Sequence, residues 1–236
     1  MQLLISRCFN QRFFATPSKT ASLLLRFGCL QQRLYNEKRN YWQYLKQKII
    51  KKPSPPYQHV CQVGDPILRS KASPVNTSEL HSPQMAKLIR TLVMVMREKN
   101  CIGLSAPQIG VPLQVIAMEF TEQIFQTNRP SMRQIKEMNP FSLKIFINPS
   151  VRVLDSRTVQ FPEGCESISG FAACVPRYHA VEIMGLNEHG QPIVWQTSGW
   201  TARIVQHEMD HLNGILYIDK MDSKTFLNIN WIVLNE

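Results

Sequence analysis

The sequence predicts an α+β domain in which small antiparallel or mixed β-sheets pack around a central helix. Only two stretches have the apolar spacing of long helices, one over residues 79–100 and one around residues 202–212. Elsewhere, short apolar runs alternate with turns that contain glycine, proline and asparagine, as short strands do. No internal repeat is visible. Two helices with several short strands indicate the α+β class.

Charge divides the chain into two parts. Residues 1–56 contain 11 Lys and Arg but a single acid, Glu37, whereas residues 57–236 contain 16 basic and 16 acidic residues. The basic pI is therefore a property of the first part. The neutral second part is not expected to bind nucleic acid.

Residues 1–56 have the composition of a mitochondrial targeting peptide followed by a linker. Basic residues are spaced through Leu, Phe, Ser and Thr with no acid before Glu37. Arg33-Leu34-Tyr35 resembles a processing site, which places cleavage near Tyr35; a basic tail without a targeting role is the alternative. No run of 18 apolar residues occurs, so no membrane span is expected. The six cysteines form no CxxC pair, which fits the reducing mitochondrial matrix.

Residues 57–236 form the predicted folded domain, which begins with α-helical and loop segments. The first long helix is expected over Glu79–Asn100, where Met, Leu, Ile and Val recur at helical spacing. Residues 101–110 contain two glycines and a proline, which favour a structured loop. Leu113–Phe120 is strand-like, and the polar residues 121–143 are expected to form an insertion or a mobile loop.

The second half of the domain is predicted to be mainly β-structure. Cys165 lies in a second glycine-bounded loop, Phe161–Gly170. The apolar tail Phe226–Leu234 is expected to form a final strand. Other short strands are expected at Ile145–Ile147, at Val151–Leu154, from Val175 onward, and at Ile193–Gln196 after a turn at Asn187–Gly190.

The second helix carries the pattern His207-Glu208-x-x-His211. Residues four apart on a helix lie one turn above each other, about 6 Å along the axis, so both imidazoles can bind one metal ion. Glu208 lies about 100° further round the helix, where its carboxylate can act as a base on a water held by that metal. A surface helix with two solvated histidines is the alternative. Asn213-Gly214 ends the helix.

A metal site of this kind needs a third protein ligand and an open position for water. In one known arrangement the third ligand is a His six residues after the second, but Tyr217 stands there. Asp219 and Asp222 are weaker candidates, and only 25 residues follow His211. Cys165, which lies upstream, is the best candidate.

Three segments in this order resemble the peptide deformylase family, and specifically its organellar members. They are Gly103-Leu-Ser-Ala-Pro-Gln108-Ile-Gly110, Glu163-Gly-Cys165-Glu-Ser167 and Gln206-His-Glu-Met-Asp-His211. Asp65–Arg69 also resembles the opening segment of the family, so the likeness covers about residues 60–225. Two positions depart from the family pattern: Cys101 replaces a frequent glycine, and Glu166 replaces the leucine that is usual in bacterial members.

The resemblance implies the peptide-deformylase fold, with the HExxH helix at its centre. It implies a metal-dependent hydrolase that removes the N-formyl group from the N-terminal formylmethionine of newly synthesised, mitochondrially encoded proteins and releases formate. Cys165, His207 and His211 would then bind one divalent ion, Fe²⁺ or Zn²⁺ with Co²⁺ as a third option.

Catalytic roles follow from the same matching positions. Glu208 would be the general base that accepts a proton from water and passes it to the leaving amine. The Gln108 amide and the backbone N–H of Glu166 would stabilise the negative charge that develops on the formyl oxygen. Gly103 is expected beside these groups.

The methionine of such a substrate needs an apolar pocket. Trp200 and Ile204 share the helix face of His207 and are expected to line it, although plain core packing is the alternative. Arg203 lies on the same face, and we expect it to pair with Glu166 across the pocket mouth. The predicted substrate-binding residues are Ile102, Gly103, Gly164, Trp200, Arg203 and Ile204.

Two other functions stay open from the sequence alone. One is a metallopeptidase that cuts internal peptide bonds, against which the missing third His and the short tail both count. The other is a binding protein without activity, for example at the mitochondrial ribosome. The complete set of Gln108, Cys165, His207, Glu208 and His211 favours an enzyme. Its expected partners are N-formylmethionyl nascent peptides and, in a second place, that ribosome.

Overall fold

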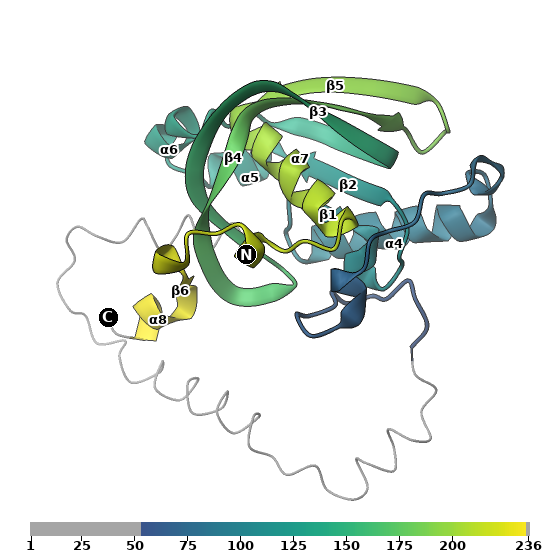
Figure 1. Ribbon diagram of the computed structural model, residues 1–236, viewed down its shortest axis with the longest axis horizontal. Helices are drawn as coiled ribbons and strands as arrows, with labels where there is room; N and C mark the ends of the chain where they lie inside the picture. Colours follow the sequence, from purple (N-terminus) through teal and green to yellow (C-terminus); the bar gives the residue numbers. More distant parts are fainter. Residues whose placement is uncertain (1–52, 235–236) are drawn as a thin grey trace, which may run out of the picture. The chain divides into compact units, whose positions relative to one another are not determined.

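The computed structural model of the protein describes residues 53–234 (Figure 1). The predicted targeting peptide lies almost entirely outside these residues. The described part contains one sheet of six strands with several helices, so the predicted α+β class is confirmed. Its main elements are α4 (Pro83–Glu98), β1 (Gly103–Ser105), β2 (Val115–Phe120), α5 (Glu122–Gln126), α6 (Pro130–Ile135), β3 (Phe141–Cys165), β4 (Ile168–Leu186), β5 (Pro192–Ser198), α7 (Gly199–Leu212), β6 (Leu227–Asn228) and α8 (Ile229–Leu234).

The sheet is antiparallel throughout. Its strands follow the order β1-β2-β3-β4-β5, and β6 pairs with β4. The β3–β4 hairpin is the longest ladder, and it turns at Glu166 and Ser167, immediately after Cys165. Figure 1 shows β3, β4 and β5 curving around α7. The predicted central helix is therefore enclosed by the sheet.

The two long helices pack on opposite faces of β2. Successive side chains of a strand point to opposite faces of its sheet. Val115 and Ala117 join the hydrophobic cluster that contains α4, whereas Ile116 and Met118 join the cluster that contains α7. All four side chains are fully buried. This is why the strand reads as a continuous apolar run in the sequence.

The loop expected over residues 101–110 contains a short strand and a 3-10 helix. β1 pairs with β2, and the 3-10 helix η3 (Ala106–Ile109) follows it directly. Gly110 ends η3 with φ 83°, a left-handed conformation that glycine adopts without strain. The segment is buried, and it places Gln108 beside the end of β3.

Three predictions for the other elements are wrong. Of the two alternatives for residues 121–143, the mobile loop is wrong, because Thr121 caps α5 through the Ile124 N–H and Pro130 begins α6; the insertion stays a prediction. The strands predicted on either side of Asn148 are one strand, β3, in which Asn148 has φ 51° and the register shifts without ending the ladder.

The third error concerns the tail, where only Leu227–Asn228 pairs with β4. The Asn228 side chain accepts the Asn230 N–H, which turns the chain into α8 in place of the predicted strand.

The remaining short helices lie in connecting segments. They are the 3-10 turns η1 (Pro66–Arg69), η2 (Thr77–Glu79), η4 (Tyr217–Asp219) and η5 (Ser223–Thr225). No helix within residues 53–234 has the length and apolar character needed to cross a membrane. The four cysteines in this range are free thiols.

Candidate active site

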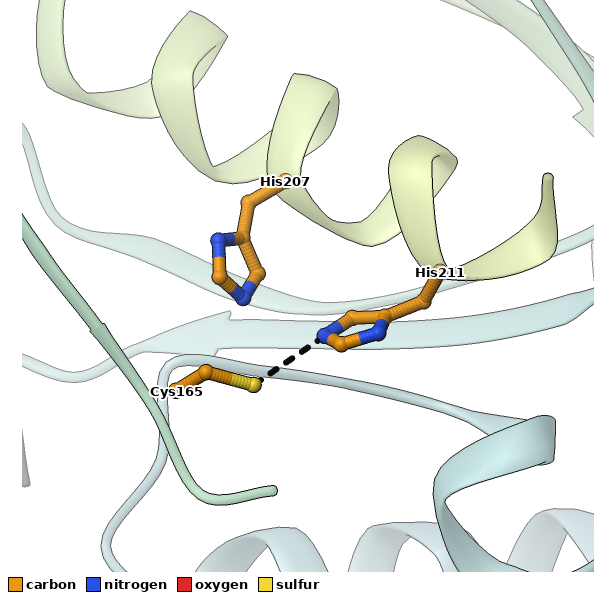
Figure 2. A group of neighbouring side chains, drawn as sticks. All are labelled: Cys165, His207 and His211. Carbon is orange, nitrogen blue, oxygen red and sulfur yellow. Dashed lines mark hydrogen bonds between the residues drawn. The ribbon is translucent and has the colours of Figure 1, made fainter. Parts of the chain in front are cut away.

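The two histidines of α7 and the cysteine of β3 converge on one point. Figure 2 shows His207 and His211 on successive turns of α7, with both rings directed toward Cys165. The ring centroids of the histidines are 4.9 Å apart, and the Cys165 Sγ lies 3.2 Å from the His211 Nε2. One ligand atom from each residue lies within 4.8 Å of the other two. The helical spacing and the predicted upstream ligand therefore meet in space.

This cluster fits a divalent metal ion. Tetrahedral sites with bond lengths of about 2.0–2.3 Å to N and S require ligand atoms roughly 3.5 Å apart, which the cluster approaches. The His207 Nδ1 lies 3.1 Å from the Glu163 Oε2, and this hydrogen bond leaves the Nε2 to face the other two residues. The donor set of one sulfur and two imidazoles suits Zn²⁺ or Fe²⁺.

Burial and neighbouring charges shift the pKa values of the two histidines in opposite directions. Burial alone would lower the pKa of His207, but hydrogen bonds to Cys165 and Glu163 raise it well above the usual value. The pKa of His211 is lowered well below its usual value by burial and by the positive charge of His207. The low pKa of His211 favours the neutral imidazole, which is the form that binds a metal ion.

Glu208 lies next to the cluster and is almost fully buried. Burial is the main reason that its pKa is raised to about 7. Its Oε2 has no hydrogen-bond partner among the described residues. A carboxylate that titrates near neutral pH and faces a metal cluster is suited to accept and release a proton.

Gln108 is held in a fixed orientation. Its Oε1 accepts hydrogen bonds from the Ser105 N–H (2.9 Å) and from the Ser105 hydroxyl (3.0 Å). Its amide nitrogen therefore points the other way, 3.2 Å from the Ser167 Oγ and 3.5 Å from the Cys165 Sγ. The N–H₂ group is aimed at the cluster, as the sequence predicts.

Glu163 organises the side of the cluster that lies away from Gln108. Besides His207, it accepts two hydrogen bonds from Arg177, at 2.9 and 2.8 Å, and one from Arg203, at 2.7 Å. Burial alone would raise the pKa of this carboxyl, but Arg177 and His207 hold it well below its usual value. Glu163 is therefore an anion that fixes the orientation of a metal ligand.

Arg177 was not expected at the site, yet it connects two acids there. It also pairs with Asp210, which in turn pairs with Lys220. Arg177 lies on β4 opposite Val159 of β3, and its side chain extends along the ladder to Glu163. No local sequence signal reveals this contact, because the sequence indicates a loop over Phe161–Gly170 where the structure has a hairpin.

An open pocket of about 410 Å³ lies against the cluster. Most residues predicted for catalysis or substrate binding line it, and so does Cys101, one of the two departures from the family pattern. The lining residues are Cys101, Ile102, Gly103, Gln108, Gly164, Cys165, Glu166, Ile204, His207 and Glu208.

Two predicted pocket residues lie elsewhere. Trp200 is 4% exposed and packs in the core under the Lys136 side chain. Arg203 is also buried, and it donates to Glu163 and to the Val175 carbonyl. The predicted pair between Arg203 and Glu166 is therefore wrong. Arg203 and Ile204 are adjacent on α7 and point about 100° apart, so Ile204 lines the pocket while Arg203 contacts β3 and β4.

Glu166 sits at the hairpin turn and lines the pocket. Its backbone carbonyl accepts a hydrogen bond from the Gln62 side chain, 2.9 Å away, which helps to hold the turn in place. The role of its backbone N–H toward a substrate stays a prediction.

Comparison with known proteins identifies the family. The sequence pattern of the family described as polypeptide deformylase matches residues 57–226. The human mitochondrial peptide deformylase is 55% identical over 199 residues, which are 84% of this chain and 82% of that protein. The Arabidopsis thaliana peptide deformylase 1A, chloroplastic/mitochondrial, is 40% identical over 71% of this chain and 62% of its own length.

Solved structures agree. A class I type b peptide deformylase from Acinetobacter baumannii bound to Met-Ala-Ser has a TM-score of 0.61 at 30% identity, covering 69% of this chain and 96% of that chain. A peptide deformylase from Synechococcus elongatus in complex with actinonin has a TM-score of 0.58 at 30% identity, covering 78% and 88%. By motif, fold and sequence identity, this chain belongs to the peptide deformylase family and is an enzyme of the mitochondrial type.

Proposed function

We propose that the pocket at Cys165, His207 and His211 hydrolyses the N-formyl amide of formylmethionine at the start of newly made proteins and releases formate. Removal of the N-formyl group is the reaction of the family to which the chain belongs. The observation that carries the residue assignment is a buried Glu208, whose Oε2 has no hydrogen-bond partner among the described residues, next to a Cys-His-His cluster.

Cys165, His207 and His211 would hold one divalent metal ion, Fe²⁺ or Zn²⁺, with Co²⁺ as an alternative. When bound, such an ion acts as a Lewis acid that polarises a carbonyl and makes water more acidic. Glu163 keeps His207 oriented for that role through the hydrogen bond to Nδ1.

Glu208 accepts the proton of the attacking water and delivers it to the amine that leaves. A general base works best when its pKa lies near the working pH. The burial of Glu208 provides that match. Proton transfer by a positioned side chain contributes roughly 10²- to 10⁴-fold to a rate.

Gln108 and the backbone N–H of Glu166 stabilise the negative charge on the formyl oxygen. The Gln108 amide is already oriented by Ser105, so no rearrangement is needed as the charge develops. Loss of one such donor typically raises the barrier by about 3–4 kcal/mol. Gly103 leaves space for Glu208 beside these donors.

The methionine side chain of the substrate contacts the apolar part of the pocket. Ile102 and Ile204 provide that surface, and Gly164 allows the substrate backbone to approach. These three residues line the pocket together with the catalytic groups, which supports the assignment.

The enzyme acts in mitochondria, on the proteins made there. The similarity to a human mitochondrial deformylase supports this location, and a reducing matrix fits the free thiols of the described residues. In this proposal residues 1–56 are the targeting peptide and linker, and residues 57–236 are the catalytic domain. Nascent peptides would be met at the mitochondrial ribosome.

The proposed chemistry is tested by formate release from formyl-Met-Ala-Ser. The full chain is purified without oxygen, beside Glu208→Gln, and the metal content of both samples is measured. We expect the wild type to release formate, and the variant to bind metal equally but to lose at least about 10²-fold in kcat. Equal activity of both proteins would exclude Glu208 as the base. Hydrolysis of casein without formate release would instead support a peptidase.

A further inference from the structure

A second cavity lies where the end of α6 meets the β3–β4 ladder and the first turn of α7. It shares no lining residue with the active-site pocket. Lys136, Arg177 and Arg203 contribute cationic groups to its wall, and Phe161 contributes an aromatic face. Glu137 and His179 also line it. None of the roles assigned above uses this space.

Lys136 is the unusual group in this cavity. Its side chain is buried, with 6% of the residue exposed, yet its Nζ has no hydrogen-bond acceptor and no carboxylate within 4.0 Å among residues 53–234. The Nζ lies 4.3 Å from the ring centroid of Trp200 and 5.6 Å from that of Phe161. Cation–π contacts offset part of the cost of burying an ammonium group but do not replace an anion.

Neighbouring charges leave the wall with an excess of positive charge. Arg177 and Arg203 share the single carboxylate of Glu163, and Asp210 divides its charge between Arg177 and Lys220. Burial, and then the positive charge of Arg203, lower the pKa of Lys136 to about 8. An anion at this position would reverse both effects.

Glu137 does not supply that anion. Its carboxylate lies 3.1 Å from the His179 Nε2, and its side chain is 52% exposed. No ion pair joins it to Lys136 in the described residues. A negative charge in water compensates a buried ammonium weakly, because solvent screens the interaction.

The size of the cavity limits what it can hold. The cavity has a volume of about 290 Å³, against about 410 Å³ for the active-site pocket. A small ion with a water molecule fits in such a space.

We propose that this cavity binds a small monoanion, of the size of chloride or formate, against the ammonium group of Lys136. Formate is considered because it is the product of deformylation, so this part of the proposal rests on the function proposed above. Binding of chloride does not depend on that function. Because Arg177 and Arg203 also hold Glu163, which orients His207, the bound anion would lie two contacts away from a metal ligand.

The test uses the full chain with its metal bound. The melting temperature is measured in increasing sodium chloride or sodium formate, with sodium gluconate added to keep the ionic strength constant. A ligand that binds only the folded state raises the melting temperature as it saturates its site. Gluconate is much larger than chloride or formate and serves as the reference anion.

Two variants separate this site from others. Lys136→Met removes the ammonium group and keeps the length of the side chain. Lys144→Met is the matched control, because the Lys144 Nζ also lies over a tryptophan ring, 4.8 Å from the centroid of Trp195, but outside the cavity. We expect the apparent affinity for chloride to fall at least about tenfold in Lys136→Met and to stay unchanged in Lys144→Met.

Anomalous scattering from wild-type crystals soaked in sodium bromide provides a second readout that does not depend on the variants. A bromide peak beside the Lys136 Nζ supports the proposal even if Lys136→Met fails to fold. If only chloride raises the melting temperature, the ligand is an inorganic ion. If both chloride and formate raise it, the site also binds the reaction product. Either result supports a monoanion site.

The opposite results would overturn the proposal. Equal responses of the wild type and Lys136→Met place the anion elsewhere, including at the metal, where formate also binds as a product. Crystals with bromide only at other positions lead to the same conclusion. In either case the assignment of deformylase activity is unaffected, because the formate-release assay tests it separately.

Discussion

The carboxylate of Glu208 occupies the space that a side chain at position 103 would need. A Cβ added to Gly103 would lie 2.8 Å from the Glu208 Cδ, closer than such atoms approach in real proteins. Glu208 comes from α7 and Gly103 from β1, so the absence of a side chain on the strand sets the position of the proposed base on the helix.

Gly103→Ala should therefore impair catalysis through Glu208. We expect kcat to fall about 10- to 100-fold with unchanged metal content, because a displacement of about 1 Å is enough to misalign a proton transfer. Steady-state kinetics and metal analysis measure both quantities. In the background of Glu208→Gln the same change should have little further effect on kcat. Additive losses would show that Gly103 acts by another route.

Gln108→Leu should lower kcat with little change in KM. The side chain keeps its volume but loses the N–H₂ group that Ser105 orients toward the cluster. We expect a loss of about 10²- to 10³-fold, or roughly 3–4 kcal/mol in the barrier, as for other donors to a developing oxyanion. Formate-release kinetics provide the measurement. A rise in KM at constant kcat would instead indicate uniform substrate binding.

Arg203→Met should destabilise the protein more than the loss of an exposed cation does. Its removal takes one buried donor away from both Glu163 and the Val175 carbonyl, and breaking a buried ion pair typically costs about 3–5 kcal/mol. Arg97→Met is the matched control: Arg97 pairs with Glu119 but its side chain is 57% exposed, so we expect a loss within about 1 kcal/mol. Urea denaturation compares the two. Similar losses would mean that the Glu163 network contributes little to stability.

The stability of the wild type should increase with pH where Lys136 titrates. Its pKa is 10.5 in an unfolded chain and is lowered to about 8 in the fold, chiefly by burial. Between these values the unfolded chain holds a proton that the folded protein has released, so the free energy of unfolding rises with pH. The full change is of the order of 3 kcal/mol.

Lys136→Met should remove this pH dependence. Urea denaturation from about pH 7 to pH 10.5, in gluconate buffers, gives the free energy of unfolding of both proteins. The contributions of other titrating groups cancel in the difference between the two values. The variant should gain stability relative to the wild type at the acid end. A constant difference across the range would show that the ammonium group is not destabilised by burial.

The catalytic helix could be predicted from the sequence because its pattern is local. The spacing of His207, Glu208 and His211 defines their positions on any helix, wherever that helix lies in the fold. Cys165 needed the resemblance to a family, since nothing local indicates that the end of β3 faces α7. In the structure, Cys165 lies with His207 and His211 in one cluster, as the family resemblance implies.

Positions that depend on strand register could not be predicted in this way. Arg177 approaches Glu163 only because the β3–β4 hairpin turns directly after Cys165. Arg203 pairs with an acid of the Glu163–Ser167 motif, but with Glu163 in place of Glu166. Its neighbour Ile204 lines the pocket, so the two side chains point to different parts of the site. Which part of the β3–β4 hairpin lies opposite each side chain depends on how the sheet packs on α7, and helical periodicity carries no information about that packing.

The β3–β4 hairpin has a consequence for the kinds of change that this chain can accept. Glu163 and Cys165 are two residues apart on β3, and both side chains reach the histidines of α7, although the register shifts between Gly164 and Cys165. Deletion of Gly164 would change the direction of one side chain relative to the other, whatever residue types remained. Substitution at the turn, as at Glu166, leaves that geometry intact. Across homologues, length should therefore vary within 121–139, in the segment of α5 and α6, and stay constant from Phe161 to Arg177.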